Sequence, residues 1–145
     1  MKKLCIILAL ALAVACSSQT AKTAHDDGRL PALKISENGR YFVTENGEPF
    51  FWLGDTGWLL FKNLDRDEAE AYLENRREKG FNVIQVMVLH TVGIANIYGD
   101  SALVNMDVTR PLVTEGADPA DSVQYDYWDH MDYIIDRAEK KGIYM

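Results

Sequence analysis

An acid and a hydroxyl lie together in one of the most apolar stretches of the chain. Residues 49–61 read PFFWLGDTGWLLF, with Asp55 and Thr56 in the middle. Burying an ionised carboxylate without partners is costly, so the fold must give Asp55 solvent or hydrogen-bond partners. At the rim of a cavity, a carboxylate and a hydroxyl bind the polar groups of a ligand, and the Trp58 ring supplies a flat apolar face. The stretch therefore predicts a binding site that contains Asp55, Thr56 and Trp58.

A histidine and a tyrosine are the next candidates. His90 ends the nearly continuous apolar run FNVIQVMVLH of residues 81–90. Gln85 lies inside this run at an odd spacing from His90, so a regular strand would point the two side chains to opposite faces. We prefer His90 because it stands at the end of the run.

The connection that follows, residues 91–126, is much longer than the roughly 2–6 residues of an ordinary βα loop, and such long loops usually build a site. Its polar candidates are Asn96, Tyr98, Asp100 and Asp107. We take Tyr98 as a further substrate contact.

Each candidate also has a structural explanation. Asp55 can be an acid that caps the turn at Trp58 or bridges a later lysine. Trp58 can belong to the core, and His90 can be a hydrogen-bonded histidine that shapes the mouth of a cavity. The sequence leaves these alternatives open.

Metal, cofactor and nucleic-acid chemistry find little support. Neither His90 nor His130 has neighbouring ligands at the spacing of a zinc site, and His130 is expected on a solvated face. The acids around it are Asp126, Asp129, Asp132 and Asp136. There is no phosphate-binding glycine loop and no serine nucleophile elbow. The formal net charge of −7 argues against binding a phosphate backbone. We predict no metal, no cofactor and no nucleic-acid partner.

The elements that position these residues alternate between strands and helices. Two Asn-Gly pairs, at residues 38–39 and 46–47, predict a three-stranded β-meander over residues 33–54. We take residues 50–54 as its last strand and as the first strand of a parallel sheet, so that Asp55 follows the strand's carboxyl end. Ligands bind at that edge in α/β sheets and barrels.

Two helices follow the same plan. The first opens at Asp65 with a capping box to Glu68 and stops at Gly80. The second has its apolar face on residues 127–138, ends with residues 139–141 and stops at Gly142. Each glycine is followed by an apolar segment typical of a buried parallel strand. The alternation predicts an α/β fold built from right-handed βαβ units.

The amino-terminal residues resemble an export signal. Residues 1–15 are positively charged and then apolar, which predicts a signal peptide, and small residues precede Cys16 as in the lipobox of bacterial lipoproteins. An ordinary secretory signal is the alternative. Residues 16–32 read as a lipidated cysteine and a flexible tether, and residues 33–145 as the globular part. We expect an exported lipoprotein that meets the membrane only through its lipid anchor, periplasmic or at the cell surface.

Three segments resemble one family of enzymes. GEPFFWLGDTGWLLF, EKGFNVIQVMVLH and YWDHMDYIIDRAEKKGIYM are similar to the apiosidase-like glycoside hydrolases, glycoside hydrolase family 140, formerly a domain of unknown function. The likeness covers residues 33–145. It implies a (β/α)₈ TIM barrel preceded by the meander. It also implies cleavage of plant-cell-wall-type polysaccharide by a retaining mechanism with two carboxylates about 5–5.5 Å apart.

The resemblance places both catalytic acids on later strands, so no catalytic residue is assigned in this chain. Asp55, Trp58 and His90 match the first part of the family pattern and would line the substrate pocket. An eight-fold barrel needs about 250 residues. We therefore expect an amino-terminal fragment of about two βα units, inactive by itself. The alternative functions are a non-catalytic surface glycan-binding lipoprotein on the same fold and a structural envelope protein.

Overall fold

The computed structural model describes residues 29–145 of the chain. The predicted signal peptide, Cys16 and the tether as far as residue 28 lie outside the described residues. None of the helices in residues 29–145 is both long enough and apolar enough to cross a membrane.

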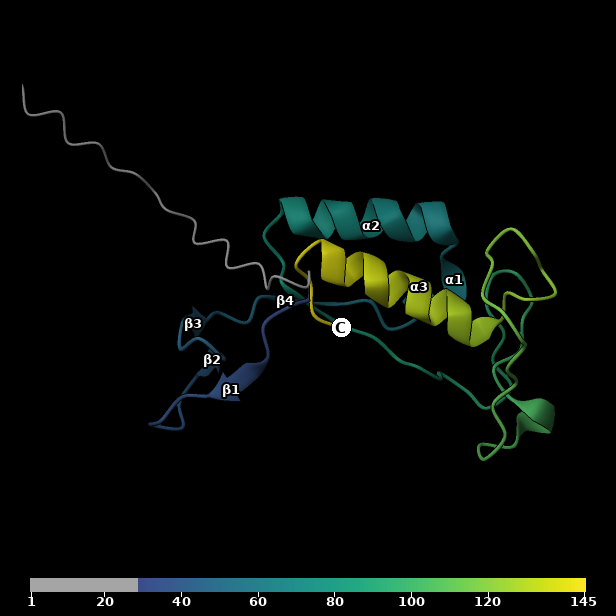
Figure 1. Ribbon diagram of the computed structural model, residues 1–145, viewed down its shortest axis with the longest axis horizontal. Helices are drawn as coiled ribbons and strands as arrows, with labels where there is room; N and C mark the ends of the chain where they lie inside the picture. The colour runs from purple at the N-terminus through teal and green to yellow at the C-terminus, as the bar shows by residue number, and fades with distance from the viewer. Residues whose placement is uncertain (1–28) are drawn as a thin grey trace, which may run out of the picture.

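The predicted meander is present at the start of the described part. Strands β1 (Leu33–Ile35), β2 (Phe42–Thr44) and β3 (Pro49–Phe50) pair antiparallel in the order β1-β2-β3 (Figure 1). The two turns place Gly39 and Gly47 at φ values of +69° and +86°, which glycine adopts without steric cost. The Asn-Gly signals therefore located both turns correctly.

A parallel arrangement follows the meander. Strand β4 (Gly54–Thr56) pairs in parallel with β5 (Val83–Gln85), and Tyr144 forms a parallel bridge with Val83 on the other side of β5. Two backbone bonds secure that third segment, since Ile84 N donates to Tyr144 O at 2.8 Å and Tyr144 N donates to Asn82 O at 2.9 Å. Three parallel segments thus lie side by side in chain order, as successive βαβ units require.

The predicted limits of both parallel strands were wrong. The first strand begins at Gly54 and not at Phe50, because the Asn82 side chain binds the backbone of residues 51–53. Its Nδ2 donates to Phe51 O at 2.6 Å, and its Oδ1 accepts from Leu53 N at 2.9 Å. The second strand ends at Gln85 and not at His90, and two residues later Met87 N donates to Trp58 O at 3.1 Å.

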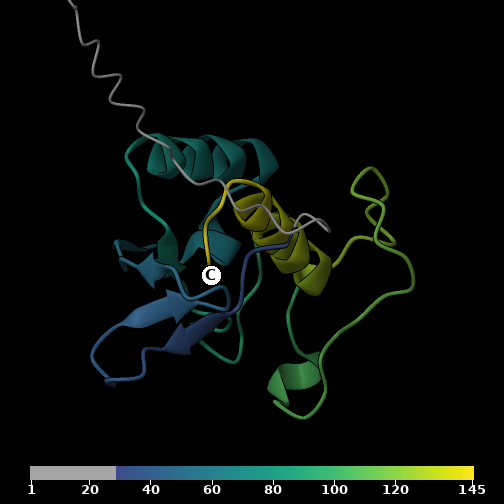
Figure 2. The ribbon, with the colours of Figure 1, turned by 60° about the vertical axis from the view of Figure 1, so that its left-hand side comes forward.

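The helices lie together on one face of the parallel strands. α1 (Leu60–Asn63) leads into α2 (Arg66–Glu78), and α3 (Tyr127–Lys140) lies beside α2 (Figures 1 and 2). Between helices and strands lies a core of Leu60, Phe61, Ala69, Leu73, Ile84, Ile134, Ala138 and Ile143.

The predicted helix ends are confirmed. Asp65 and Glu68 form a complete capping box at α2. A second capping box, between Asp126 and Asp129, opens α3. Gly80 and Gly142 follow the two helices at φ near +80°.

The acidic neighbours of His130 predicted a solvated face for it, and this prediction was wrong. His130 is fully buried in α3, with Nδ1 3.1 Å from the Tyr125 hydroxyl and Nε2 3.0 Å from Leu64 O. Only Asp132 and Asp136 of its acidic neighbours are exposed, because the other two cap the helix. Charge pattern alone does not separate a capping acid from a solvated one.

The connection from residue 91 to 126 is irregular, as expected, and has its own small core. It contains a short 3-10 turn (Val104–Met106) and bridges between residues 95 and 101 and between 103 and 111. Its buried apolar residues are Ile94, Ala102, Leu103 and, from α3, Tyr127. Trp128 Nε1 donates to Ala102 O at 3.0 Å and ties the connection to α3.

Candidate functional site

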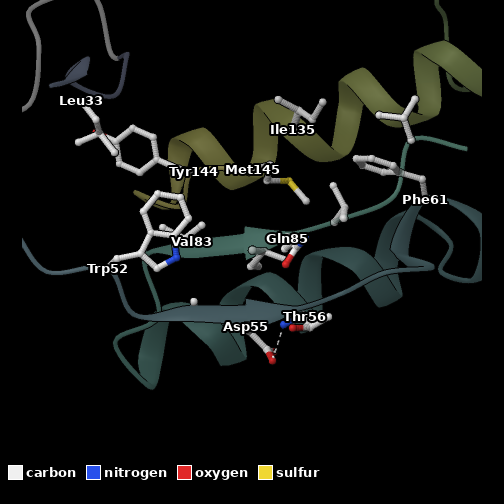
Figure 3. Close-up of a pocket in the computed structure, with 14 residues that line it drawn as sticks. Leu33, Trp52, Asp55, Thr56, Phe61, Val83, Gln85, Ile135, Tyr144 and Met145 are labelled. Carbon is white, nitrogen blue, oxygen red and sulfur yellow. Dashed lines mark hydrogen bonds between the residues drawn. The ribbon is translucent and has the colours of Figure 1, made fainter. Parts of the chain in front are cut away.

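A cavity of about 890 Å³ lies beside β4 and β5. It is lined by Gly54, Thr56, Val83 and Gln85 on one face of the strands, and it also reaches Asp55, Phe61, Ile84 and Ile135. Thr56 and Gln85 are the last residues of β4 and β5, are paired in the parallel register, and both line this cavity. Figure 3 shows Trp52, Val83 and Tyr144 gathered at one end, with Gln85 and Thr56 farther along the strands. A hydroxyl and an amide, both solvent-exposed, therefore sit side by side where the strands end.

The amino end of the cavity is aromatic. The Trp52 ring lies 5.5 Å from Phe42 and 6.4 Å from Phe50, and Phe50 lies 5.3 Å from Tyr144, measured between ring centroids. Trp52 packs so close to β4 that a Cβ on Gly54 would stand 2.9 Å from its Nε1 atom. Leu33 of β1, Trp52 and Tyr144 form the apolar end of the cavity, and the polar end lies at Thr56 and Gln85.

Asp55 lies within β4 and points away from Thr56, toward α2. Successive side chains of a strand face opposite sides, so Asp55 cannot share the face of Gly54 and Thr56. Its Oδ2 accepts from the Tyr72 hydroxyl at 2.9 Å and forms an ion pair with Arg76 Nε, and its Oδ1 accepts from Thr56 N at 2.8 Å. The expected position after the carboxyl end of the strand was wrong.

The sequence left open that Asp55 has a structural role and bridges a later lysine. These contacts support a structural role, but the partner is Arg76 and not a lysine. The hydrogen-bonded Arg76 guanidinium holds the pKa of the Asp55 carboxyl below its usual range. Burial, together with the bond to Asp55, raises the pKa of the Tyr72 phenol, so that it stays a donor. Arg76 also lies 4.4 Å above the centroid of the Tyr72 ring. Asp55 therefore fastens the end of β4 to α2 beside Thr56, and a direct contact of Asp55 with substrate stays a prediction.

Trp58 lies nearer to the end of its strand than His90 does to the end of its own. Trp58 follows β4 in the turn to α1, and 54% of its surface is exposed. Its backbone oxygen accepts from Met87 N, which holds the turns after β4 and β5 together. His90 is exposed but lies well beyond the end of β5, and neither Trp58 nor His90 lines the cavity. Gln85, which we had set aside in favour of His90, occupies the strand end. Gln85 was passed over because the strand was expected to run to His90, whereas β5 ends at Gln85.

Tyr98 lies apart from this cavity. Its hydroxyl accepts from Arg66 N at 3.0 Å, and its ring lies 5.2 Å from His130 and 6.1 Å from Tyr125. The other polar candidates of the connection make local turns. Asn96 Oδ1 accepts from two backbone N–H groups, and Asp107 accepts from Thr109. No group of three or more histidine, cysteine or acidic residues within residues 29–145 is arranged to hold a metal ion.

Comparison with known proteins points to one family. The family "Apiosidase-like, catalytic domain" matches residues 36–145. A solved structure named "Glycoside hydrolase" is 50% identical with a TM-score of 0.63, and the match covers 79% of this chain and 24% of that one. A glycoside hydrolase family 5 structure from Bacteroides vulgatus is 46% identical with a TM-score of 0.62, over 77% of this chain and 23% of that one. No curated protein matches.

The chain spans about a quarter of the length of these two structures. The family match covers most of the chain and includes β4, β5 and all three helices. As the resemblance of its three segments predicted, the chain belongs to the apiosidase-like family of glycoside hydrolases.

Proposed function

We propose that this chain forms the first parallel strands of a (β/α)₈ barrel that hydrolyses a plant-cell-wall-type polysaccharide. The family match and the two glycoside hydrolase structures support a glycosidase that acts on carbohydrate. The observation that carries the proposal is the pairing of Thr56 with Gln85 at the polar end of the cavity. That end is where enzymes with parallel sheets and barrels bind their ligands.

The roles of the residues follow from their chemistry. The Gln85 amide both donates and accepts, and the Thr56 hydroxyl does the same, so together they bind neighbouring hydroxyl groups of a sugar. The exposed Trp58 ring offers a flat face against which a sugar ring packs. Asp55 orients Thr56 through its backbone N–H. Contacts from His90 and Tyr98 to substrate remain predictions.

The proposed mechanism is the retaining one, with a carboxylate nucleophile and a carboxylic acid about 5–5.5 Å apart and a covalent glycosyl intermediate. We assign neither carboxylate within this chain. Its own residues bind the sugar, orient it and exclude water on one side of the site. Analysis of the anomeric form of the first product by NMR tests this, because an inverted product rules out the retaining mechanism.

The test of hydrolysis uses the complete product of the gene that carries this chain. A reducing-sugar assay over plant-cell-wall polysaccharides is combined with affinity electrophoresis on the same substrates. We expect Thr56→Val and Gln85→Ala to lower kcat/KM by tenfold or more. Thr44→Val, on β2 and outside the cavity, serves as the matched control and is expected to leave it unchanged.

Each outcome decides between the functions. Retarded migration without any release of reducing ends identifies the glycan-binding alternative and rejects the hydrolase. Full activity in both cavity variants rejects the assigned binding residues.

We further propose that the mature protein is a lipoprotein anchored at Cys16, exported to the periplasm or the cell surface. Metabolic labelling with a fatty acid tests this. Labelled wild type and unlabelled Cys16→Ser support the anchor, whereas an unlabelled wild type leaves an ordinary secretory signal.

A further inference from the structure

A second cavity, of about 160 Å³, shares no lining residue with the first. Its walls are Arg66, Tyr98, Asp100, Pro119, Ala120, Ser122 and Tyr125. It forms where the connection of residues 91–126 meets the beginnings of α2 and α3, at one end of the molecule (Figure 1). None of these residues has a role in the site proposed above, apart from the contact predicted for Tyr98.

Two opposite charges line this cavity without neutralising each other. Within residues 29–145, neither the Arg66 guanidinium nor the Asp100 carboxylate forms an ion pair. The guanidinium carbon of Arg66 instead lies 5.1 Å from the Tyr98 ring centroid and 4.9 Å from that of Tyr125. Asp100 Oδ2 accepts one bond, from Asn96 Nδ2 at 3.0 Å. The Arg66 guanidinium also hydrogen-bonds to the Tyr125 side chain, so its remaining N–H groups, together with Asp100 Oδ1, keep hydrogen-bonding capacity for a ligand.

The walls of the cavity are held in place by bonds behind them. Arg66 N donates to the Tyr98 hydroxyl at 3.0 Å, and Asp100 N donates to Asn96 Oδ1 at 2.9 Å. The Tyr125 hydroxyl bonds to the buried His130, 3.1 Å away, and burial raises the pKa of this phenol to about 12. These bonds hold the Tyr98 and Tyr125 side chains and the backbone at Arg66 and Asp100, and tyrosine rings fixed in this way lose little conformational entropy on binding.

We propose that this cavity is a second carbohydrate subsite, which holds one neutral sugar residue through two adjacent hydroxyl groups. One hydroxyl accepts from the Arg66 guanidinium and the other donates to the Asp100 carboxylate, and both bonds are charge-assisted. An anionic ligand would meet Asp100 and a cationic one would meet Arg66, whereas a neutral diol satisfies both charges. Tyr98, 43% exposed, adds an apolar surface for the ring.

This inference rests on the proposed function for its ligand class, but it concerns a different surface. A cavity of this size holds one residue of a glycan. The sugar bound here is a distant residue of the same polysaccharide, or part of a neighbouring chain of it.

Isothermal titration calorimetry of the chain with neutral tetrasaccharides tests the subsite. The probes are xylotetraose, cellotetraose and galactotetraose, with glucuronic acid as the anionic comparison. The variants Arg66→Met and Asp100→Asn each remove one charge and keep most of the side-chain volume. We expect each to raise the Kd of the best neutral probe tenfold or more. Arg110→Met, an exposed arginine of the same connection, is expected to leave it unchanged.

NMR of the wild-type chain gives a second readout that does not depend on how the variants fold. We expect the ring resonances of Tyr98 and Tyr125 to shift on addition of the neutral probe. Unshifted tyrosines, no binding of any neutral probe, or a preference for glucuronic acid overturns the subsite.

The subsite and the proposed hydrolase fail separately. Hydrolysis that depends on Gln85, together with binding that is insensitive to Arg66→Met, rejects the subsite alone. Binding that is sensitive to Arg66→Met, in a protein that hydrolyses nothing, rejects the hydrolase alone.

Discussion

The bond network around Asp55 gives the sharpest test of how this chain holds its site. Asp55→Asn keeps the shape of the side chain but removes the charge and one of the two carboxylate oxygens. The remaining oxygen cannot serve Thr56 N and Tyr72 together as both carboxylate oxygens do. The new amide NH₂ would face Arg76, donor against donor.

The magnitude follows from the exposure of the pair. Hydrogen bonds to charged groups contribute about 1.5–3 kcal/mol, and fully exposed ion pairs about 0.2–1 kcal/mol. The Arg76 and Asp55 side chains are 25% and 26% exposed, which places them between these cases. We expect Asp55→Asn to lower the free energy of unfolding by about 1–2 kcal/mol.

Urea unfolding followed by circular dichroism measures this loss, with an unchanged m-value as the sign that only stability has changed. In a double-mutant cycle with Arg76→Met, we expect a coupling energy of about 1 kcal/mol. The matched control is Asp136→Asn, which removes an acid that is half exposed and pairs with Lys140 within one helix. That variant should stay within about 0.5 kcal/mol of wild type. An Asp55→Asn variant as stable as this control, or a coupling near zero, would refute the reasoning.

The pH dependence of the unfolding free energy gives a second check on the contacts of Asp55. The pKa of Asp55 is lowered in the folded state, so its contribution is fully present above the unfolded pKa of about 3.9. It is lost as the pH falls through the folded pKa. The stability difference between wild type and Asp55→Asn should therefore disappear at strongly acid pH. A difference that persists there would show that packing and not charge is responsible.

Three further changes test other parts of the fold. Burial lowers the pKa of His130, so stability should be fully present above about pH 6.5 and decline below it, and His130→Gln should remove this decline in pH-dependent urea unfolding. Asn82→Ala removes both side-chain bonds to residues 51–53 and should lower the unfolding free energy by about 1–2 kcal/mol in urea. Gly57→Ala places a Cβ 3.2–3.3 Å from atoms of Ile84, Leu60 and Tyr72. This overpacking should cost about 1–3 kcal/mol and lower the melting temperature. An unchanged melting temperature would show that these side chains move aside.

The sequence predicted the features that depend on neighbouring residues. The capping box at Asp65, the helix stop at Gly80 and the turns at Gly39 and Gly47 are all present. Each is specified within a few residues of chain, because a cap bonds to the first turn and a tight turn requires positive φ. The alternation of strands and helices and the family motif around Asp55 are likewise properties of the chain itself.

Contacts across the fold decided the rest. The limits of β4 depend on a side chain, Asn82, about thirty positions farther along the chain. The face of β4 on which the Asp55 side chain lies follows from where the strand begins and ends, because side chains alternate between faces. Its partners on that face, Tyr72 and Arg76, come from α2. The burial of His130 depends on Leu64, at the junction of two other helices. A local pattern shows that a polar residue needs partners, but only the packed structure brings those partners to it.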